Sequence, residues 1–138
     1  MAFKTLDERL AQLEAIISDM KQENLEIPIV VEGLRDIESL QKLGFSGEIL
    51  SINIGKTLLN FCEMYAKDHK KVIILMDWDP RGRRLRKSLN AKFQLAHVEV
   101  NDIYWLELRK LAFPEIKDIQ SLASLMERLR EKKRLLSI

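Results

Sequence analysis

The sequence predicts an α/β fold in which short buried strands alternate with helices around a mostly parallel sheet. Apolar runs at residues 29–31 and 71–76 lack the polar alternation of a half-exposed strand, so both faces of each strand should be buried. Segments with the apolar spacing of amphipathic helices separate these runs. This alternation is typical of βαβ units, whose strands lie parallel in one sheet.

The first half of the chain supplies two strands and three helices. A helix over residues 5–22 is indicated by an apolar stripe at helical spacing, formed by Leu6, Leu10, Leu13, Ile17 and Met20. After the first strand, Asp36 is the expected N-cap of a helix that should end near Gly44. A second strand is predicted within 48–55, and a helix within 56–69.

The second half begins with a strand at 71–77 that ends in an acidic pair, and a helix is expected from 82 to 93. A fourth strand follows at 96–100, and two helices interrupted by Pro114 fill most of 103–136. We expect a single domain over 1–138, with a core at about 26–105 and the terminal helices packed on it. A helical contact between two copies in a homodimer is an alternative use of these helices.

Composition limits the class of protein. Of 138 residues, 46% are apolar and 32% charged, which is typical of a soluble globular chain. No apolar run is long enough to cross a bilayer, and the N-terminus lacks the pattern of a signal peptide, so we expect a cytoplasmic protein without membrane contact. The single cysteine, Cys62, excludes an intramolecular disulfide and a cysteine-rich zinc site.

The positive charge is concentrated in the second half of the chain. Residues 77–138 hold 14 Lys and Arg against 9 Asp and Glu, whereas residues 1–76 hold 9 against 12. Most of the excess lies in 81–92 and 128–134. Local basic clusters are typical of proteins that bind nucleic acid, although solvated helices carry them as well.

Three carboxylates are expected at the carboxyl ends of strands: Glu32 after the first, and Asp77 and Asp79 after the third. Ligands of open parallel sheets bind outside these ends, where neighbouring strands would bring the three acids together. The alternation of a strand should place both aspartates on one side and Trp78 on the other. Such carboxylates repel one another unless a cation lies among them, and Mg²⁺ prefers oxygen ligands. A simple helix cap is the alternative role for the aspartate pair.

Phosphate-binding groups are expected beside this acidic site. Gly33 leaves room above Glu32, and Gly82 lies near the predicted start of a helix, where free N–H groups attract phosphate. Positive side chains follow at once, namely Arg81, Arg83, Arg84, Arg86 and Lys87. Lys56, in the loop after the second strand, is a further candidate contact to a substrate.

These residues carry a family resemblance. The segment VVEG, with Glu32 and Gly33, is followed 45 residues after the glutamate by DWDPRG, with Asp77, Asp79 and Gly82. Together they resemble the signature of the Toprim domain, which topoisomerases, bacterial primases and several small nucleases share. The chain departs from the topoisomerase pattern, because no acidic residue directly follows Gly82.

The resemblance covers roughly residues 26–105 and implies a Rossmann-like Toprim fold with a four-stranded, mostly parallel sheet between helices. It also implies a Mg²⁺ site, with Mn²⁺ as an alternative metal, in which Asp77 and Asp79 bind the ion. Glu32 would bind it too or act as general acid and base. Asp36 matches the pattern of primases and small nucleases, but it fits a helix cap better than a metal ligand.

The family resemblance implies phosphoryl transfer on RNA or DNA. A chain of this length has no room for the tyrosine domain of a topoisomerase, and one cysteine cannot build the zinc module of a primase. A small endonuclease is therefore the leading interpretation. Two alternatives stay open: a nucleic-acid-binding or assembly module with little activity alone, and a primase-like nucleotidyl transferase that works with a partner protein.

Overall fold

The computed structural model describes residues 5–137. Within that range the strands are β1 (Ile29–Val31), β2 (Ile49–Ser51), β3 (Lys71–Ile74) and β4 (Glu99–Asn101). The helices there are α1 (Leu6–Asn24), α2 (Leu34–Lys42), α3 (Leu58–Ala66), α4 (Pro80–Leu95), α5 (Ile103–Ala112) and α6 (Leu122–Leu136).

The strands form one sheet in the order β2-β1-β3-β4, and every neighbouring pair is parallel. Ile29 of β1 pairs with Ile49 of β2 on one side and with Ile73 of β3 on the other. The predicted α/β fold with a mostly parallel, four-stranded sheet is confirmed. Because β1 and β3 are parallel neighbours, the segments that follow them leave the sheet side by side, at the carboxyl ends of the strands.

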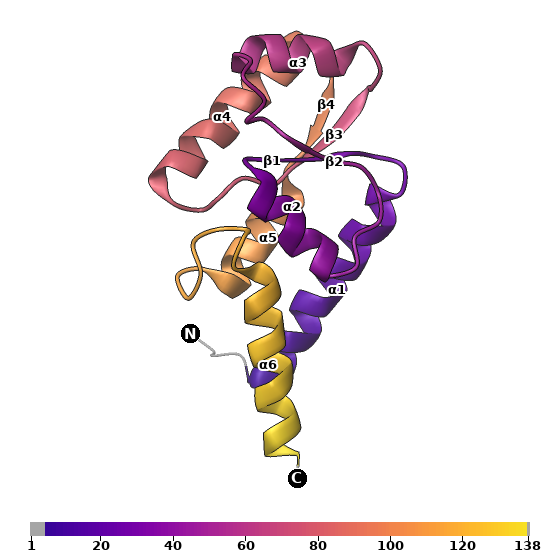
Figure 1. Ribbon diagram of the computed structural model, residues 1–138. Coiled ribbons are helices and arrows are strands. Elements are labelled where there is room, and N and C mark those ends of the chain that lie inside the picture. Colours follow the sequence, from indigo (N-terminus) through magenta and orange to yellow (C-terminus); the bar gives the residue numbers. More distant parts are fainter. Residues whose placement is uncertain (1–4, 138) are drawn as a thin grey trace.

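Helices cover both faces of the sheet, which explains why its central strands are apolar throughout (Figure 1). Alternate strand residues Val30, Val72 and Ile74 pack with Phe61 of α3 and Phe93 of α4. The other residues of β1 and β3 face the layer formed by α1, α2, α5 and α6.

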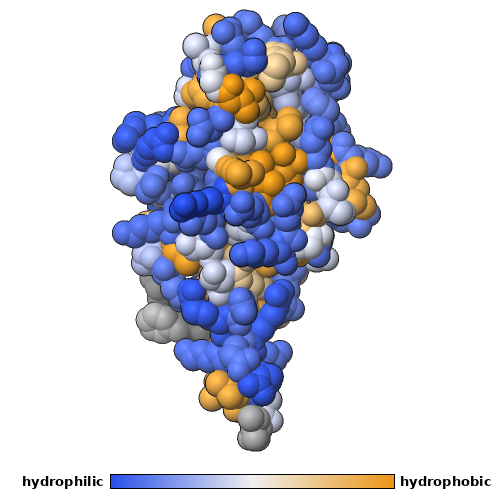
Figure 2. Space-filling model, viewed as in Figure 1, coloured by the Kyte–Doolittle hydropathy of each residue, from blue (hydrophilic) through white to orange (hydrophobic). Residues whose placement is uncertain are grey.

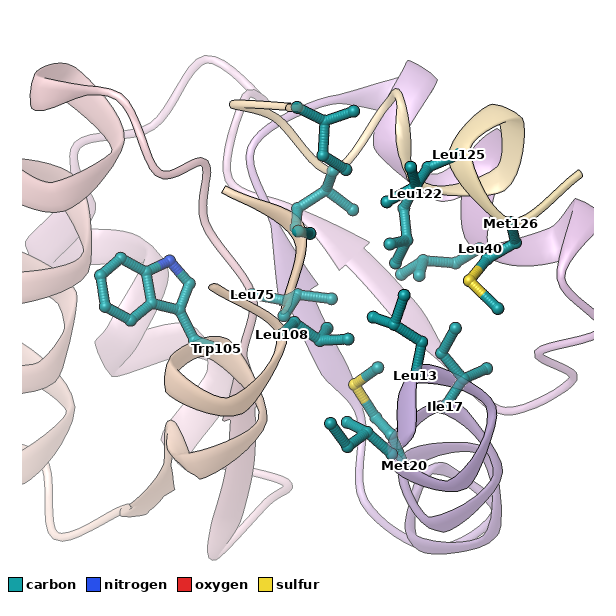
Figure 3. Packing of buried hydrophobic residues seen from close by; sticks show 14 of the residues in the cluster. Leu13, Ile17, Met20, Leu40, Leu75, Trp105, Leu108, Leu122, Leu125 and Met126 are labelled. Atoms are coloured by element: carbon teal, nitrogen blue, oxygen red, sulfur yellow. The ribbon is translucent and has the colours of Figure 1, made fainter. Parts of the chain in front are cut away.

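The layer formed by α1, α2, α5 and α6 brings the first and the last described helices into contact. In Figure 3, Leu13 and Ile17 of α1 lie across from Leu40 of α2 and from Leu125 and other residues of α6. Leu13, Leu40 and Leu125 are fully buried, and burial of each such side chain contributes about 1.5–3 kcal/mol. This packing holds the loop before α6 at the edge of the sheet.

Three boundaries differ from the sequence prediction around the acidic residues. β3 ends at Ile74 rather than at residue 77, because the chain leaves the sheet before the acidic pair. α4 begins at Pro80 rather than at 82. Proline is tolerated at the first helical position because the N–H of that residue has no partner within the helix. Gly33, not Asp36, is the N-cap of α2. Asp36 is the third residue of the helix, and its side chain accepts a hydrogen bond of 3.0 Å from the Gly33 N–H.

The surface seen in Figure 2 is mostly hydrophilic, with one hydrophobic patch near the middle of this face. Exposed apolar side chains also lie at the end of α6, where Leu135 and Leu136 are 55% and 72% exposed. None of the helices within residues 5–137 is long and apolar enough to cross a membrane.

Candidate metal centre

Carboxylates gather where β1 and β3 end. Glu32 directly follows β1, and Asp77 lies in the segment between β3 and α4. Asp36 comes from the first turn of α2, and Asp118 from the loop between α5 and α6. Because β1 and β3 are neighbouring parallel strands, Glu32 and Asp77 lie at the same end of the strands.

Asp77 is the most strongly perturbed of the four carboxylates. Burial is the largest cause, and together with the nearby negative charges of Asp36, Glu32 and Asp118 it raises the pKa of Asp77 to about 7, against the opposing effect of a hydrogen bond from the Ile119 N–H. Burial is also the main cause of a raised pKa at Asp36, with Glu32 and Asp118 adding to it. A cation among these groups would favour their ionised forms.

Main-chain groups fix Asp77 and its neighbour. The Ile119 N–H donates to Oδ1 of Asp77 at 3.0 Å. Trp78 is buried, its main-chain N–H donates to the Lys117 carbonyl at 2.8 Å, and its indole N–H donates to the Trp105 carbonyl at 3.1 Å. Trp78 is therefore a packing residue that anchors the acidic segment to the core.

Asp79 is the N-cap of α4, and its Oδ1 accepts a hydrogen bond from the Gly82 N–H at 2.7 Å. The capping role weighed for the aspartate pair thus applies to Asp79. Asp79 is not among the charged groups that shift the pKa of Asp77. The two aspartates are therefore held by different elements, Asp77 by the loop before α6 and Asp79 by α4.

The two glycines differ in what they do. A Cβ at Gly82 would lie 2.3 Å from the carbonyl oxygen of Asp77, so glycine is needed for the close approach of α4 to the acidic segment. The Gly82 N–H is already bound to Asp79. A Cβ at Gly33 would meet no atom within 4 Å, so the space above the end of β1 is open.

Arg81 lies beside the acidic residues. Its guanidinium forms an ion pair with the carboxylate of Glu32, whose side chain is 18% exposed, whereas that of Arg81 is 70% exposed. In this arrangement Arg81 supplies a positive charge to the acidic centre. Arg81 belongs to the first turn of α4, the helix that carries the other arginines.

The donor set suits Mg²⁺ in its chemistry, since all the side chains offer oxygen. Among residues 5–137, no three His, Cys, Asp or Glu side chains already stand close enough to hold a metal ion together. Mg²⁺ does not require such a cage, because it commonly binds through one or two carboxylates together with waters and substrate phosphates. Glu32 and Asp77, which follow the neighbouring strands β1 and β3, could take that role.

A basic hollow of about 360 Å³ lies along the N-terminal half of α4. Its lining consists of Pro80, Arg83, Arg84, Arg86, Lys87 and Trp105. Arg83 and Arg84 are exposed, and the structure records no ion pair for either within residues 5–137. Their charge is therefore available to a phosphate backbone.

Arg86 and Lys56 differ from those two arginines. Arg86 is bound to the carboxylate of Asp102, and its guanidinium lies 4.3 Å from the ring centre of Trp105. Arg86 thus has a structural use in the floor of the hollow. Lys56 is exposed on the loop between β2 and α3. In the sheet, β2 lies on one side of β1, which Glu32 follows, and β3, which leads into α4, lies on the other.

Sequence reasoning missed Asp118 and Ile119. The only local signal is that Asp118 precedes Ser121 by three residues, which is typical of a helix start, and Asp118 indeed accepts a hydrogen bond from the Ser121 N–H at 2.8 Å. Nothing in that pattern indicates the proximity to Asp77, which depends on how α6 packs.

Comparisons with known proteins agree with this architecture. The Toprim domain family profile matches residues 27–110. A UPF0292 protein of Methanocaldococcus jannaschii is 39% identical over 118 residues, which cover 86% of this chain and 92% of the relative. A UPF0292 protein of Methanosarcina barkeri is 34% identical, with 90% and 87% covered. A solved structure, a putative protein from Aquifex aeolicus, is similar in fold with a TM-score of 0.70 and 24% identity, over 80% of this chain and 97% of the other.

Proposed function

The chain belongs to the Toprim domain family, and from that premise we propose that it is a Mg²⁺-dependent endonuclease that cleaves RNA or DNA. Toprim domains generally bind divalent metal ions and act on nucleic acid. The proposal extends this family property to a reaction and to particular residues of this chain.

The observation that carries the proposal is the meeting of carboxylates from separate elements at one edge of the sheet. Glu32 and Asp36 act electrostatically on Asp77, although more than 40 residues separate them in the chain. Repulsion among partly buried carboxylates opposes folding unless a cation offsets it, and carboxylates with perturbed pKa values are often found at functional sites.

In the proposed site, Asp77 and Glu32 hold the metal, and Asp79 contributes the oxygen that is not occupied as a helix cap. Bound Mg²⁺ supplies positive charge that stabilises the negative charge developing on the phosphate. In the alternative role that the family implies, Glu32 would act as general acid or base in place of binding the metal. Arg81, Arg83 and other cations of α4 bind the phosphate backbone.

A nucleic-acid-binding or assembly module with little activity alone is the second candidate. It is supported by the ion pair between Glu32 and Arg81 and by the fact that no three potential ligands in residues 5–137 are already clustered for a metal. Such a protein would bind nucleic acid in a salt-dependent way and never cleave it with Mg²⁺ or Mn²⁺.

The test is a double substitution, Asp77→Asn with Asp79→Asn. Asparagine keeps the side-chain oxygens that accept from the Ile119 and Gly82 N–H groups, and it removes both charges. We expect cleavage of structured RNA or DNA that requires Mg²⁺ in the natural chain and falls at least about 100-fold in the variant.

The matched control is Glu63→Gln with Asp68→Asn, which removes two exposed acidic charges at α3 and the turn after it. This control should cleave as the natural chain does. Unchanged cleavage by the Asp77 and Asp79 variant would contradict the proposed catalytic site. Salt-dependent binding without cleavage by the natural chain would favour the second candidate.

A further inference from the structure

The loop between α5 and α6 lies against the acidic centre through its main chain. The Lys117 carbonyl accepts from the Trp78 N–H at 2.8 Å, and the Ile119 N–H donates to Oδ1 of Asp77 at 3.0 Å. The main chain of Gln120 lies close enough to Asp36 to lower its pKa. Successive residues of one loop therefore reach both strand-end segments.

Asp118 is the acidic member of this loop, and its side chain is only partly exposed. Its Oδ1 accepts from the Ser121 N–H at 2.8 Å, which fixes the orientation of its carboxylate. Asp118 directly precedes Ile119, whose N–H donates to Oδ1 of Asp77 at 3.0 Å, so its carboxylate belongs to the segment that contacts the acidic centre.

The core keeps this loop in place. Ile119 and Leu122 are fully buried, and the Ala123 N–H at the start of α6 donates to the Ser39 hydroxyl of α2 at 3.1 Å. The loop is thus bound to α2 and to the segment after β3 at the same time. A segment held by several independent contacts is suited to fixing the groups it touches.

The Toprim match ends at residue 110, before this loop begins. We propose that residues 117–120 complete the metal centre from outside the matched domain, with the Ile119 N–H orienting Asp77 and Asp118 adding a carboxylate that favours the bound cation. This inference rests on the proposed function, because it concerns the same metal site. Ile119 and Asp118 are positioning residues, and neither is assigned as a direct ligand.

The physical reason is that the two carboxylate oxygens of Asp77 have different partners. With Oδ1 held by the Ile119 N–H, the other oxygen has a fixed direction in which to meet a cation. Asp118 increases the negative potential at that point. Residues that orient metal ligands typically change metal affinity roughly 10- to 100-fold when they are altered.

The test measures Mn²⁺ affinity by isothermal titration calorimetry on the full chain, so it does not depend on catalysis. Asp118→Asn retains an oxygen for the Ser121 N–H and removes the charge, and we expect roughly tenfold weaker binding. Asp118→Glu restores the charge and should recover part of the affinity. Glu115→Gln, in the same loop, removes an exposed carboxylate that pairs with Arg9 and Arg128, and this variant should bind as the natural chain does.

Thermal unfolding of each variant shows whether it is folded. Equal affinity in Asp118→Asn and the natural chain would overturn the inference and leave the proposed function standing. An equal loss in Glu115→Gln would overturn it too, because the effect would then be one of overall charge. Failure of the natural chain to bind Mn²⁺ would overturn the proposed metal site, and the inference with it.

Discussion

Asp77 is the residue whose chemistry depends most on its surroundings. Burial and three neighbouring carboxylates raise its pKa to about 7 from the ordinary value of 3.8. Without a metal, it is therefore largely protonated in mildly acidic solution, whereas the same side chain in the unfolded chain has lost its proton. This difference makes the stability of the metal-free protein depend on pH.

We predict that metal-free protein loses stability as the pH rises from about 4 to about 7. In this range the folded state binds one more proton at Asp77 than the unfolded state, so the free energy of unfolding decreases with pH. Above pH 7 this contribution is lost. Because the side chain is partly exposed, we expect a change of about 1–2 kcal/mol rather than the full value for the shift.

Urea unfolding at pH 4.5 and pH 7.5 in the presence of a chelator, compared with Asp77→Asn, measures this effect. The variant should lack this part of the pH dependence, and saturating Mg²⁺ should reduce it in the natural chain, because a cation favours the ionised carboxylate. The same pH dependence in both proteins would contradict a raised pKa at Asp77.

Local sequence predicted some of these residues and could not predict others. Glu32 and Asp77 could be placed at one edge because each follows a buried strand, and the structure confirms that β1 and β3 are neighbours. The capping role of Asp79 was weighed, but nothing local separates it from the role of Asp77. Asp118 could not be found, because its position depends on long-range packing of α6.

At the scale of elements, α4 combines two features that bear on function. Its N-terminus abuts the acidic segment, with Gly82 allowing the close approach. Its exposed side carries Arg83 and Arg84, next to the hollow over Trp105. The helix therefore places positive charge directly beside the carboxylates, in an arrangement suited to holding a phosphate backbone against a metal site.

We predict that Arg83→Gln with Arg84→Gln weakens the binding of RNA or DNA, and that the loss of affinity is similar for nucleic acids of different base sequence. Each lost phosphate contact reduces the slope of log K against log salt concentration by about 0.7–0.9. If both arginines contact phosphates, the slope should fall by about 1.5. Fluorescence anisotropy over a series of salt concentrations measures it.

Lys67→Gln with Lys70→Gln is the matched control for this measurement. Both lysines are exposed and lie between α3 and the start of β3, at the opposite edge of the sheet from the carboxylates. This control should leave the slope nearly unchanged. An equal loss in both double variants would show that binding depends on overall charge and not on α4.

Element types were predictable, and their ends less so. Apolar runs without alternation predicted strands covered on both faces, and the four strands and their parallel pairing follow that expectation. The ends near the site depend on side-chain caps and on packing. β3 stops early because its continuation, through Trp78, enters the layer of α1, α5 and α6 instead of extending the sheet.

At the scale of the whole molecule, both ends of the described chain serve the site indirectly. α1 and α6 lie side by side, α6 also packs on α2, and the loop before α6 contacts Asp77 (Figure 1). We propose that these helices and the matched domain fold as one unit. The single-domain organisation and a homodimer stay predictions.

The central claim is that the carboxylates after β1 and β3 bind one divalent cation. Two main-chain N–H groups report on the aspartates directly, since Ile119 donates to Asp77 and Gly82 to Asp79. Two others offer comparison signals at the starts of α1 and α3, because Glu8 and Asn60 donate to threonine hydroxyls in the same way.

The most direct measurement is therefore a Mg²⁺ titration of ¹⁵N-labelled protein followed by NMR. We predict saturable shifts of the Ile119 and Gly82 amide signals, with the Glu8 and Asn60 signals nearly unchanged, and loss of the Ile119 response in Asp77→Asn. No saturable shift at Ile119 and Gly82, or equal shifts at all four amides, would contradict a metal site at the ends of β1 and β3.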